Sequence, residues 1–302
     1  MTPNKTERNL TGRGFIASPL QSFLWLVAAF LILLIVTAMC QQIVGATGIS
    51  QRSQLLVGSA LQGILAFIIP SLTVARIESP TPGKTIGFGI PSWKAVAGVA
   101  ILYAISLPAF NQIVLWNAEM SLPDSMAALE KTLRQWEDNA EAATSVILDD
   151  PSWWGLVSGV LVVGVVTGIA EEMFFRGGIQ RILSRTSIGP VASVWIAAFI
   201  FSAVHFQFFG FVPRLLLGAM FGYLYLWTRS IWVPAVAHAI NNSMVVVASW
   251  LTARGAVEAD LDNIGAASTG FPWMAVASAA ITIVFLVKAR RTLFSAKRPE
   301  KY

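Results

Sequence analysis

Long apolar runs dominate the chain and predict its secondary structure. A helix needs about 20 apolar residues to cross the hydrocarbon core of a bilayer, which is about 30 Å thick. Runs of that kind lie at residues 20–43, 54–75, 94–116, 152–173, 191–211, 213–228, 231–251 and 271–288. Only a tight turn near Gly210 and Pro213 separates the fifth run from the sixth. The pattern therefore predicts an all-α, polytopic integral membrane protein, a bundle of about eight transmembrane helices.

The segment 117–150 is too polar to span a membrane and follows a different period. Its apolar positions recur at steps that alternate between four and three residues, so they form one stripe along a helix. They are Leu122, Met126, Leu129, Leu133, Trp136, Ala140, Ala143 and Ile147. We therefore expect a helix or helical hairpin that lies on the membrane surface or over the bundle. A lid that handles substrate is the alternative interpretation.

Charge is scarce in this chain, and its placement predicts the orientation. Only 12% of the residues are charged, against about 25% in an ordinary soluble domain, and the mean hydropathy is +0.66. With a cytoplasmic N-terminus, 16 of the 21 Lys and Arg residues lie on the inner side. The other five, on the outer side, are Arg52, Lys131, Arg134, Arg214 and Arg254. This bias follows the positive-inside rule and predicts a multi-pass protein of the cell inner (plasma) membrane with both termini cytoplasmic.

The same features bear on partners. Orientation accounts for the net charge of +5, so the charge does not indicate a nucleic-acid partner. The basic tail from Lys288 is expected to bind anionic membrane lipid. The single cysteine, Cys40, excludes an internal disulfide and a cysteine-rich metal site. The pattern determines no oligomeric state.

These observations predict four parts of the chain. Residues 1–116 hold three N-terminal membrane helices, and residues 117–150 form the extracytoplasmic amphipathic segment. Residues 151–251 form a core of four spans, and residues 252–302 hold the final span and the basic cytoplasmic tail.

The core of four spans carries ionisable groups at membrane depth. Glu171, Glu172 and Arg176 lie at the inner end of the fourth span, and the chain's two histidines, His205 and His238, lie in the fifth and seventh. Each group taken alone could be structural, as a solvated cluster at a helix end or as a packed, hydrogen-bonded histidine. Charged and titratable groups are costly in lipid, however, and their gathering in one half of the chain favours a functional site inside the bundle.

Helical spacing separates the roles of these residues. Glu172 and Arg176 are four residues apart and share a helix face, so they can form an ion pair. Glu171 lies about 100° further round the helix, which leaves its carboxylate for chemistry. His238 and Asn242 also share a face.

Three motifs in this region resemble the CAAX-protease and bacteriocin-processing family, also called CPBP or Abi. The family pattern reads Glu-Glu-x-x-x-Arg, then Phe-x-x-x-His, then His-x-x-x-Asn. In this chain the three motifs span residues 171–176, 201–205 and 238–242, in order and on separate predicted helices. The resemblance covers about residues 152–251, which would make the core of four spans a catalytic core.

The resemblance implies a function and roles for the site residues. The expected activity is an intramembrane endopeptidase that acts on a membrane-associated or lipid-modified protein or peptide. Glu171 would be the general base, and His205 would help to hold the water. His238 and Asn242 would donate hydrogen bonds to the oxyanion, while Glu172 and Arg176 would brace the helix. A non-enzymatic relative, a bacteriocin immunity protein or a partner-binding scaffold, is the alternative.

The residues leave two points open. Glu171, His205 and His238 match the two-histidine, one-glutamate set of catalytic zinc, so zinc is a candidate cofactor. The paired-histidine His-Glu-x-x-His helix is absent, and we favour a metal-free mechanism. The second point is depth, because the expected spans place Glu171 near the inner face and His205 far from it. The two meet only if the fourth span tilts or continues inward, or if the fifth starts late.

Overall fold

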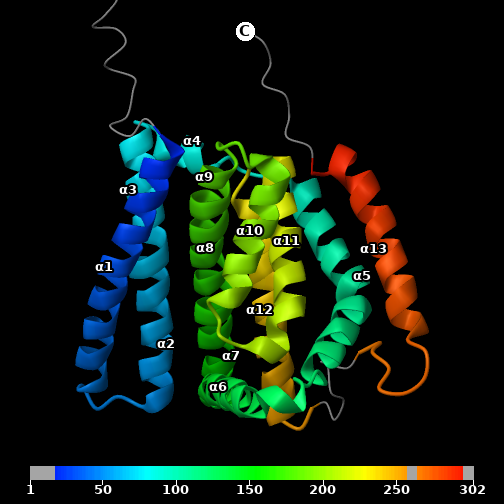
Figure 1. Ribbon diagram of the computed structural model, residues 1–302. Coiled ribbons are helices and arrows are strands. Elements are labelled where there is room, and N and C mark those ends of the chain that lie inside the picture. The colour runs from blue at the N-terminus through cyan, green and yellow to red at the C-terminus, as the bar shows by residue number, and fades with distance from the viewer. Residues whose placement is uncertain (1–17, 257–263, 295–302) are drawn as a thin grey trace, which may run out of the picture.

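The computed structural model describes residues 18–256 and 264–294, and every regular element in these residues is a helix (Figure 1). The first half contains α1 (Pro19–Gly45), α2 (Gln51–Leu61), η2 (Gln62–Ile68), α3 (Ile69–Glu78), α4 (Pro82–Ile86), α5 (Trp93–Ala118), η3 (Asp124–Met126) and α6 (Ala127–Leu148). The second half contains α7 (Trp153–Gly159), η4 (Val160–Val166), α8 (Thr167–Glu172), η5 (Met173–Gln180), α9 (Arg181–Leu183), α10 (Gly189–Ala203), η6 (Phe208–Gly210), α11 (Phe211–Thr228), α12 (Trp232–Ala253) and α13 (Trp273–Thr292). The all-α prediction is confirmed.

Within residues 18–256 and 264–294, six helices are long and apolar enough to cross a membrane. They are Pro19–Gly45, Gln51–Glu78, Trp93–Ala118, Trp153–Leu183, Phe208–Thr228 and Trp273–Thr292. The two other predicted spans are also helices of the bundle (Figure 1), but α10 is short and α12 is not among the six. The chain is therefore a multi-pass helical membrane protein. The predicted fifth span, 191–211, was too long, because its helix ends at Ala203.

The two ends of the bundle are distinct. In Figure 1, α1 begins and α13 ends at the end of the bundle where α4 lies, whereas α6 lies across the opposite end. We call these the α4 end and the α6 end. The segment 117–150 therefore lies at the opposite end of the bundle from the start of α1 and the end of α13. Part of the predicted basic bias falls at Lys5, Arg8, Arg13, Lys297, Arg298 and Lys301, which lie outside the described residues.

Large apolar side chains cover the outer surface of the bundle, as lipid contact requires. Tryptophans mark several helix starts, and each is more than half exposed: Trp93 on α5, Trp153 and Trp154 on α7, and Trp273 on α13. Tryptophan favours the water–lipid boundary because its ring is apolar and its N–H is polar. These residues are therefore placed as interfacial anchors.

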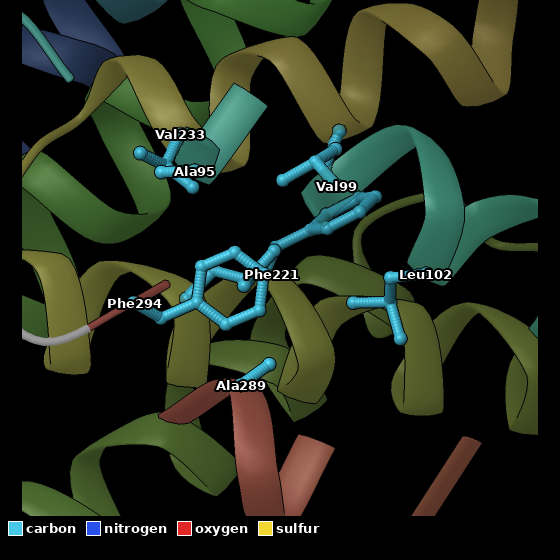
Figure 2. Close-up of a cluster of buried hydrophobic side chains, with 9 residues drawn as sticks. Ala95, Val99, Leu102, Phe221, Val233, Ala289 and Phe294 are labelled. Atoms are coloured by element: carbon cyan, nitrogen blue, oxygen red, sulfur yellow. The ribbon is translucent and has the colours of Figure 1, made fainter. Parts of the chain in front are cut away.

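A buried apolar cluster joins α11 and α12 to α5 and α13. Figure 2 shows Val99 and Leu102 of α5 with Phe221 of α11, Val233 of α12 and Ala289 of α13. Helices in lipid associate through close packing rather than through a hydrophobic gain over the solvent. This cluster fixes α11, whose Phe221 also reaches the polar site described below.

Glycines let α12 approach the fourth span closely. A Cβ atom added at Gly164 would lie 2.2 Å from the Ser243 side-chain oxygen, and one at Gly168 would lie 3.1 Å from the Ala239 backbone nitrogen. Small residues permit this backbone-to-backbone contact between membrane helices. The contact brings His238, next to Ala239 on α12, against the glutamates of α8.

Candidate active site

The fourth span is one helix from Trp153 to Leu183, longer than the predicted run 152–173. Glu171 and Glu172 close α8, between the π-helical segments η4 and η5. They lie about 17 Å along the axis before the helix ends, so the depth mismatch is resolved by a helix that continues inward. Arg176, which was predicted at the inner end of the fourth span, is 0% exposed within the bundle, and the helix continues past it to Leu183.

Glu172, Arg176 and His238 form one buried network. Arg176 Nη1 donates to Glu172 Oε1 at 2.6 Å, and His238 Nδ1 lies 2.9 Å from the same oxygen. Since an ionised carboxylate only accepts, His238 Nδ1 is the donor in that contact. Arg176 Nη2 also donates to the backbone carbonyl of Gly218 on α11, at 2.8 Å. The predicted ion pair therefore forms, and it also binds two further helices.

Aromatic rings enclose this network. The Arg176 guanidinium lies over the rings of Phe201 and Phe221, with its carbon 4.9 and 5.5 Å from their centroids. The Phe221 ring stacks on His238 at 5.0 Å. Aromatic faces attract cations and exclude water. Phe201 of the second motif thus contacts both Arg176 of the first motif and His238 of the third.

Glu171 has a different environment from its neighbour. Its side chain is 12% exposed, whereas that of Glu172 is 0% exposed. Glu171 lines a cavity of about 630 Å³, together with His205, His238 and Asn242. His238 Nε2 lies 3.6 Å from Glu171 Oε2. One histidine ring therefore stands between the two carboxylates, and only Glu171 faces the cavity.

His205 lies beyond the helix that was predicted to carry it. Because α10 ends at Ala203, His205 occupies the following turn, where Phe206 adopts a φ of 54°. Its Nδ1 lies 2.7 Å from the Phe201 backbone carbonyl and must be the donor there. In the neutral ring, Nε2 is then left as an acceptor. The α6 helix packs on this turn through the rings of Trp136 and Phe206.

Asn242 is oriented by its neighbours. Its Nδ2 donates to the Val163 backbone carbonyl at 3.1 Å, and its Oδ1 accepts from Asn241 Nδ2 at 3.2 Å. A side-chain amide carries two N–H donors, so one of them is not used by Val163. The predicted donor role of Asn242 stays a prediction.

The three candidate zinc ligands do not form a metal-binding set in this conformation. Across residues 18–256 and 264–294, no group of three His, Cys, Asp or Glu side chains is arranged to hold a metal ion. The Nδ1–H of His238 donates to Glu172, and Nε2 is the nitrogen of that ring that faces Glu171. We therefore derive no catalytic step through zinc, and the roles below are those of the side chains of Glu171, His205 and His238 themselves.

Sequence reasoning missed one charged residue of the cavity. Arg214 was counted as an outer loop charge, but it lies in the first turns of α11 and lines the cavity with Glu171. The sequence could have indicated this position, because Arg214 lies three residues before Leu217 and seven before Phe221, on the same helix face as these two cavity residues. The polar residues Thr167 and Asn241 of the lining were also not predicted as site residues.

Comparison with known proteins bears on the same region. Residues 153–244 match the family model for type II CAAX prenyl endopeptidase Rce1-like proteins. Three proteins of Bacillus subtilis (strain 168) are similar. The chain is 33% identical over 89 residues to "Uncharacterized protein YpbD", a match that covers 28% of this chain and 42% of that protein. It is 26% identical over 194 residues to "Putative membrane peptidase YdiL", covering 62% and 70% respectively.

The third relative, "Uncharacterized protein YyaK", is 26% identical over 141 residues, covering 44% of this chain and 46% of that protein. The chain thus matches less than half the length of YpbD and of YyaK. No solved structure matches it significantly. The family model covers all three motifs and the helices that bring them together. Over residues 153–244, the chain is similar to the CAAX-protease and bacteriocin-processing (CPBP, Abi) family.

Proposed function

We propose that the protein is an intramembrane endopeptidase in which Glu171 is the general base. Its substrate would be a membrane-associated or lipid-modified protein or peptide. The observation that carries the proposal is the contrast between two adjacent carboxylates. Glu172 is buried and bound by Arg176 and His238, whereas Glu171 faces a cavity that it shares with His205.

The reaction needs a deprotonated water, a proton for the leaving amine and donors for the oxyanion. Glu171 takes a proton from a water that also donates to His205 Nε2. The water oxygen attacks the carbonyl carbon, and Glu171 later gives the proton to the amine nitrogen as the C–N bond breaks. A base placed in this way contributes about 10²–10⁴-fold to the rate.

His238 and Asn242 supply the donors in this proposal. An imidazolium at position 238 would donate Nδ1–H to Glu172 and present Nε2–H to the oxyanion. The unused N–H of Asn242 is the second donor. Glu172 and Arg176 would act as positioning residues, because they fix the ring of His238 without lining the cavity.

The test compares membrane proteins between cells that express wild type and cells that express Glu171→Gln. Glutamine keeps the size of the side chain but removes the base. We expect protein fragments that depend on wild type to fall at least about 10²-fold with this variant, while the melting temperature in detergent stays nearly unchanged. Glu141→Gln, on the exposed face of α6, is the matched control and should keep full activity.

Full activity of Glu171→Gln would refute the assignment of the base. Identical fragments in wild-type cells and in cells that lack the protein, with its cellular effect retained in Glu171→Gln, would favour the non-enzymatic alternative.

A further inference from the structure

Arg214 is a second charged group in the cavity, and the proposed reaction does not use it. Arg214, Leu217 and Phe221 share one face of α11, and all three line the cavity. Phe221 stacks on His238 at one end of this face. Arg214 lies seven residues earlier, about 10 Å along the helix axis. The guanidinium and the Glu171 site therefore belong to different depths of one cavity.

The guanidinium is held in place by uncharged groups. Arg214 Nη2 donates to Gln207 Oε1 at 2.8 Å, and Nη1 donates to the Gln207 backbone carbonyl at 3.4 Å. Gly210 leaves room for it, because a Cβ atom there would lie 2.9 Å from Arg214 Nη2. These contacts orient the fork and use two of its five N–H donors.

No carboxylate of the described residues forms a direct ion pair with this arginine. Arg52, Arg134, Arg176, Arg181 and Arg185 each have a carboxylate within 4.0 Å. In the described part of the chain, Arg214 has none at that distance.

The acid that α6 presents to this region does not pair with Arg214 either. Glu137 accepts instead from the Phe209 backbone N–H at 3.0 Å. The charges of Glu137 and Glu171 act on Arg214 from a distance, and neither forms a direct ion pair with it. A half-buried arginine without a direct ion pair, with free donors in a cavity, is suited to an anionic ligand.

We propose that Arg214 binds a carboxylate of the substrate and so determines specificity. This inference rests on the proposed peptidase function. A guanidinium fork binds a carboxylate through two parallel hydrogen bonds, and the partial burial of Arg214 strengthens them. The carboxylate is either the C-terminus of the peptide or the side chain of an aspartate or glutamate. In both cases it lies on the same short peptide stretch as the bond that is cleaved.

The decisive experiment measures binding separately from cleavage. The probe is a library of apolar decapeptides in four forms, with a free or amidated C-terminus and with glutamate or glutamine at one internal position. The full-length Glu171→Gln protein in detergent is used to capture them, and mass spectrometry quantifies what is retained. Charge-assisted hydrogen bonds predict about a 10- to 100-fold preference for one acidic form over its neutral copy.

Variants assign this preference to Arg214. It should disappear when Arg214→Gln is added and be weakened by Arg214→Lys, which keeps the charge but loses the fork. Gly210→Ala should also weaken it by displacing the guanidinium. Arg254→Gln is the control, since Arg254 is exposed, lies at the end of α12 and does not line the cavity. Preference for the free C-terminus and preference for the internal glutamate distinguish the two sources of carboxylate.

Equal retention of all four forms, or a preference that survives Arg214→Gln, would overturn the proposal. The same peptides are then incubated with wild-type protein. A binding preference without any cleavage would leave the Arg214 site standing and count against the peptidase. Cleavage with no preference for an acidic form would support the peptidase function and count against the Arg214 site.

Discussion

The helix from Trp153 to Leu183 carries one arginine–carboxylate group at mid-depth, and a second lies where the helix ends. In the middle, Glu172 and Arg176 are fully buried and bind His238 of α12. At the α4 end, Glu78 of α3 accepts from Arg181 at 2.5 Å and from Arg185 at 2.8 Å.

The two groups differ in what lies beside the carboxylate. Glu78 stands alone between two arginines, one of them 40% exposed, so the group joins α3 to the end of the fourth span. Glu172 has a second acid next to it, and the same histidine reaches both. In the central group the ion pair binds Glu172 and leaves the neighbouring Glu171 facing the cavity, where it can react. In the α4-end group both arginines bind the single acid, Glu78, so this group only holds helices together.

Breaking the central pair should have the largest effect on stability. Glu172→Gln leaves Arg176 partly unpaired in the bundle, and removing one partner of a buried pair costs about 3–5 kcal/mol. Thermal and chemical unfolding in detergent measure this loss, and the rate should fall as well because the acceptor of His238 Nδ1–H is no longer charged. Adding Arg176→Gln should restore part of the stability, since no unpaired charge remains. A stability loss of the same size in Glu171→Gln would contradict the division of roles.

Breaking the α4-end group should affect stability but not catalysis. Glu78→Gln removes the negative charge and one of the two acceptor oxygens that Arg181 and Arg185 use; each charge-assisted hydrogen bond is worth about 1.5–3 kcal/mol, less where water reaches the site. Activity per folded molecule should stay at the wild-type level. Arg185→Gln is the milder companion, with an expected loss below about 1 kcal/mol because its side chain is exposed. A loss of catalytic rate in Glu78→Gln at full folding would show that the two groups are coupled.

The smallest expected effect is that of a chelator. If Glu171 and His205 activate water by themselves, dialysis against a strong chelator should leave the activity of the purified protein unchanged. Activity that is lost and then restored by zinc, at about one zinc per chain, would reassign Glu171, His205 and His238 as ligands. The central group would then contain a bound metal ion as well as the additional acid, Glu171, and the α4-end group would contain neither.

Much of this architecture was predictable from local sequence. Apolar runs predicted the helices, because an unsatisfied backbone is too costly in lipid. The spacing of Glu172 and Arg176 predicted their ion pair, which the structure contains. Helix ends were predicted less well. The fourth span continues through Arg176 and Arg181 because these arginines form ion pairs with Glu172 and Glu78. A hydropathy profile contains no information about such partners.

The sequence by itself determined which residues are costly at membrane depth and must therefore find partners: Glu171, Glu172, Arg176, His205 and His238. Only the tertiary structure decided which partner each one has. Helical periodicity sets the angle between Glu171 and Glu172, but it does not determine which helix lies at each angle. The close approach of α12 at Gly164 and Gly168 directs Glu172 to His238, and the turn after Ala203 places His205 in the cavity. The carboxylate left free, and the unpaired Arg214 in the same cavity, follow from contacts between residues far apart in the chain.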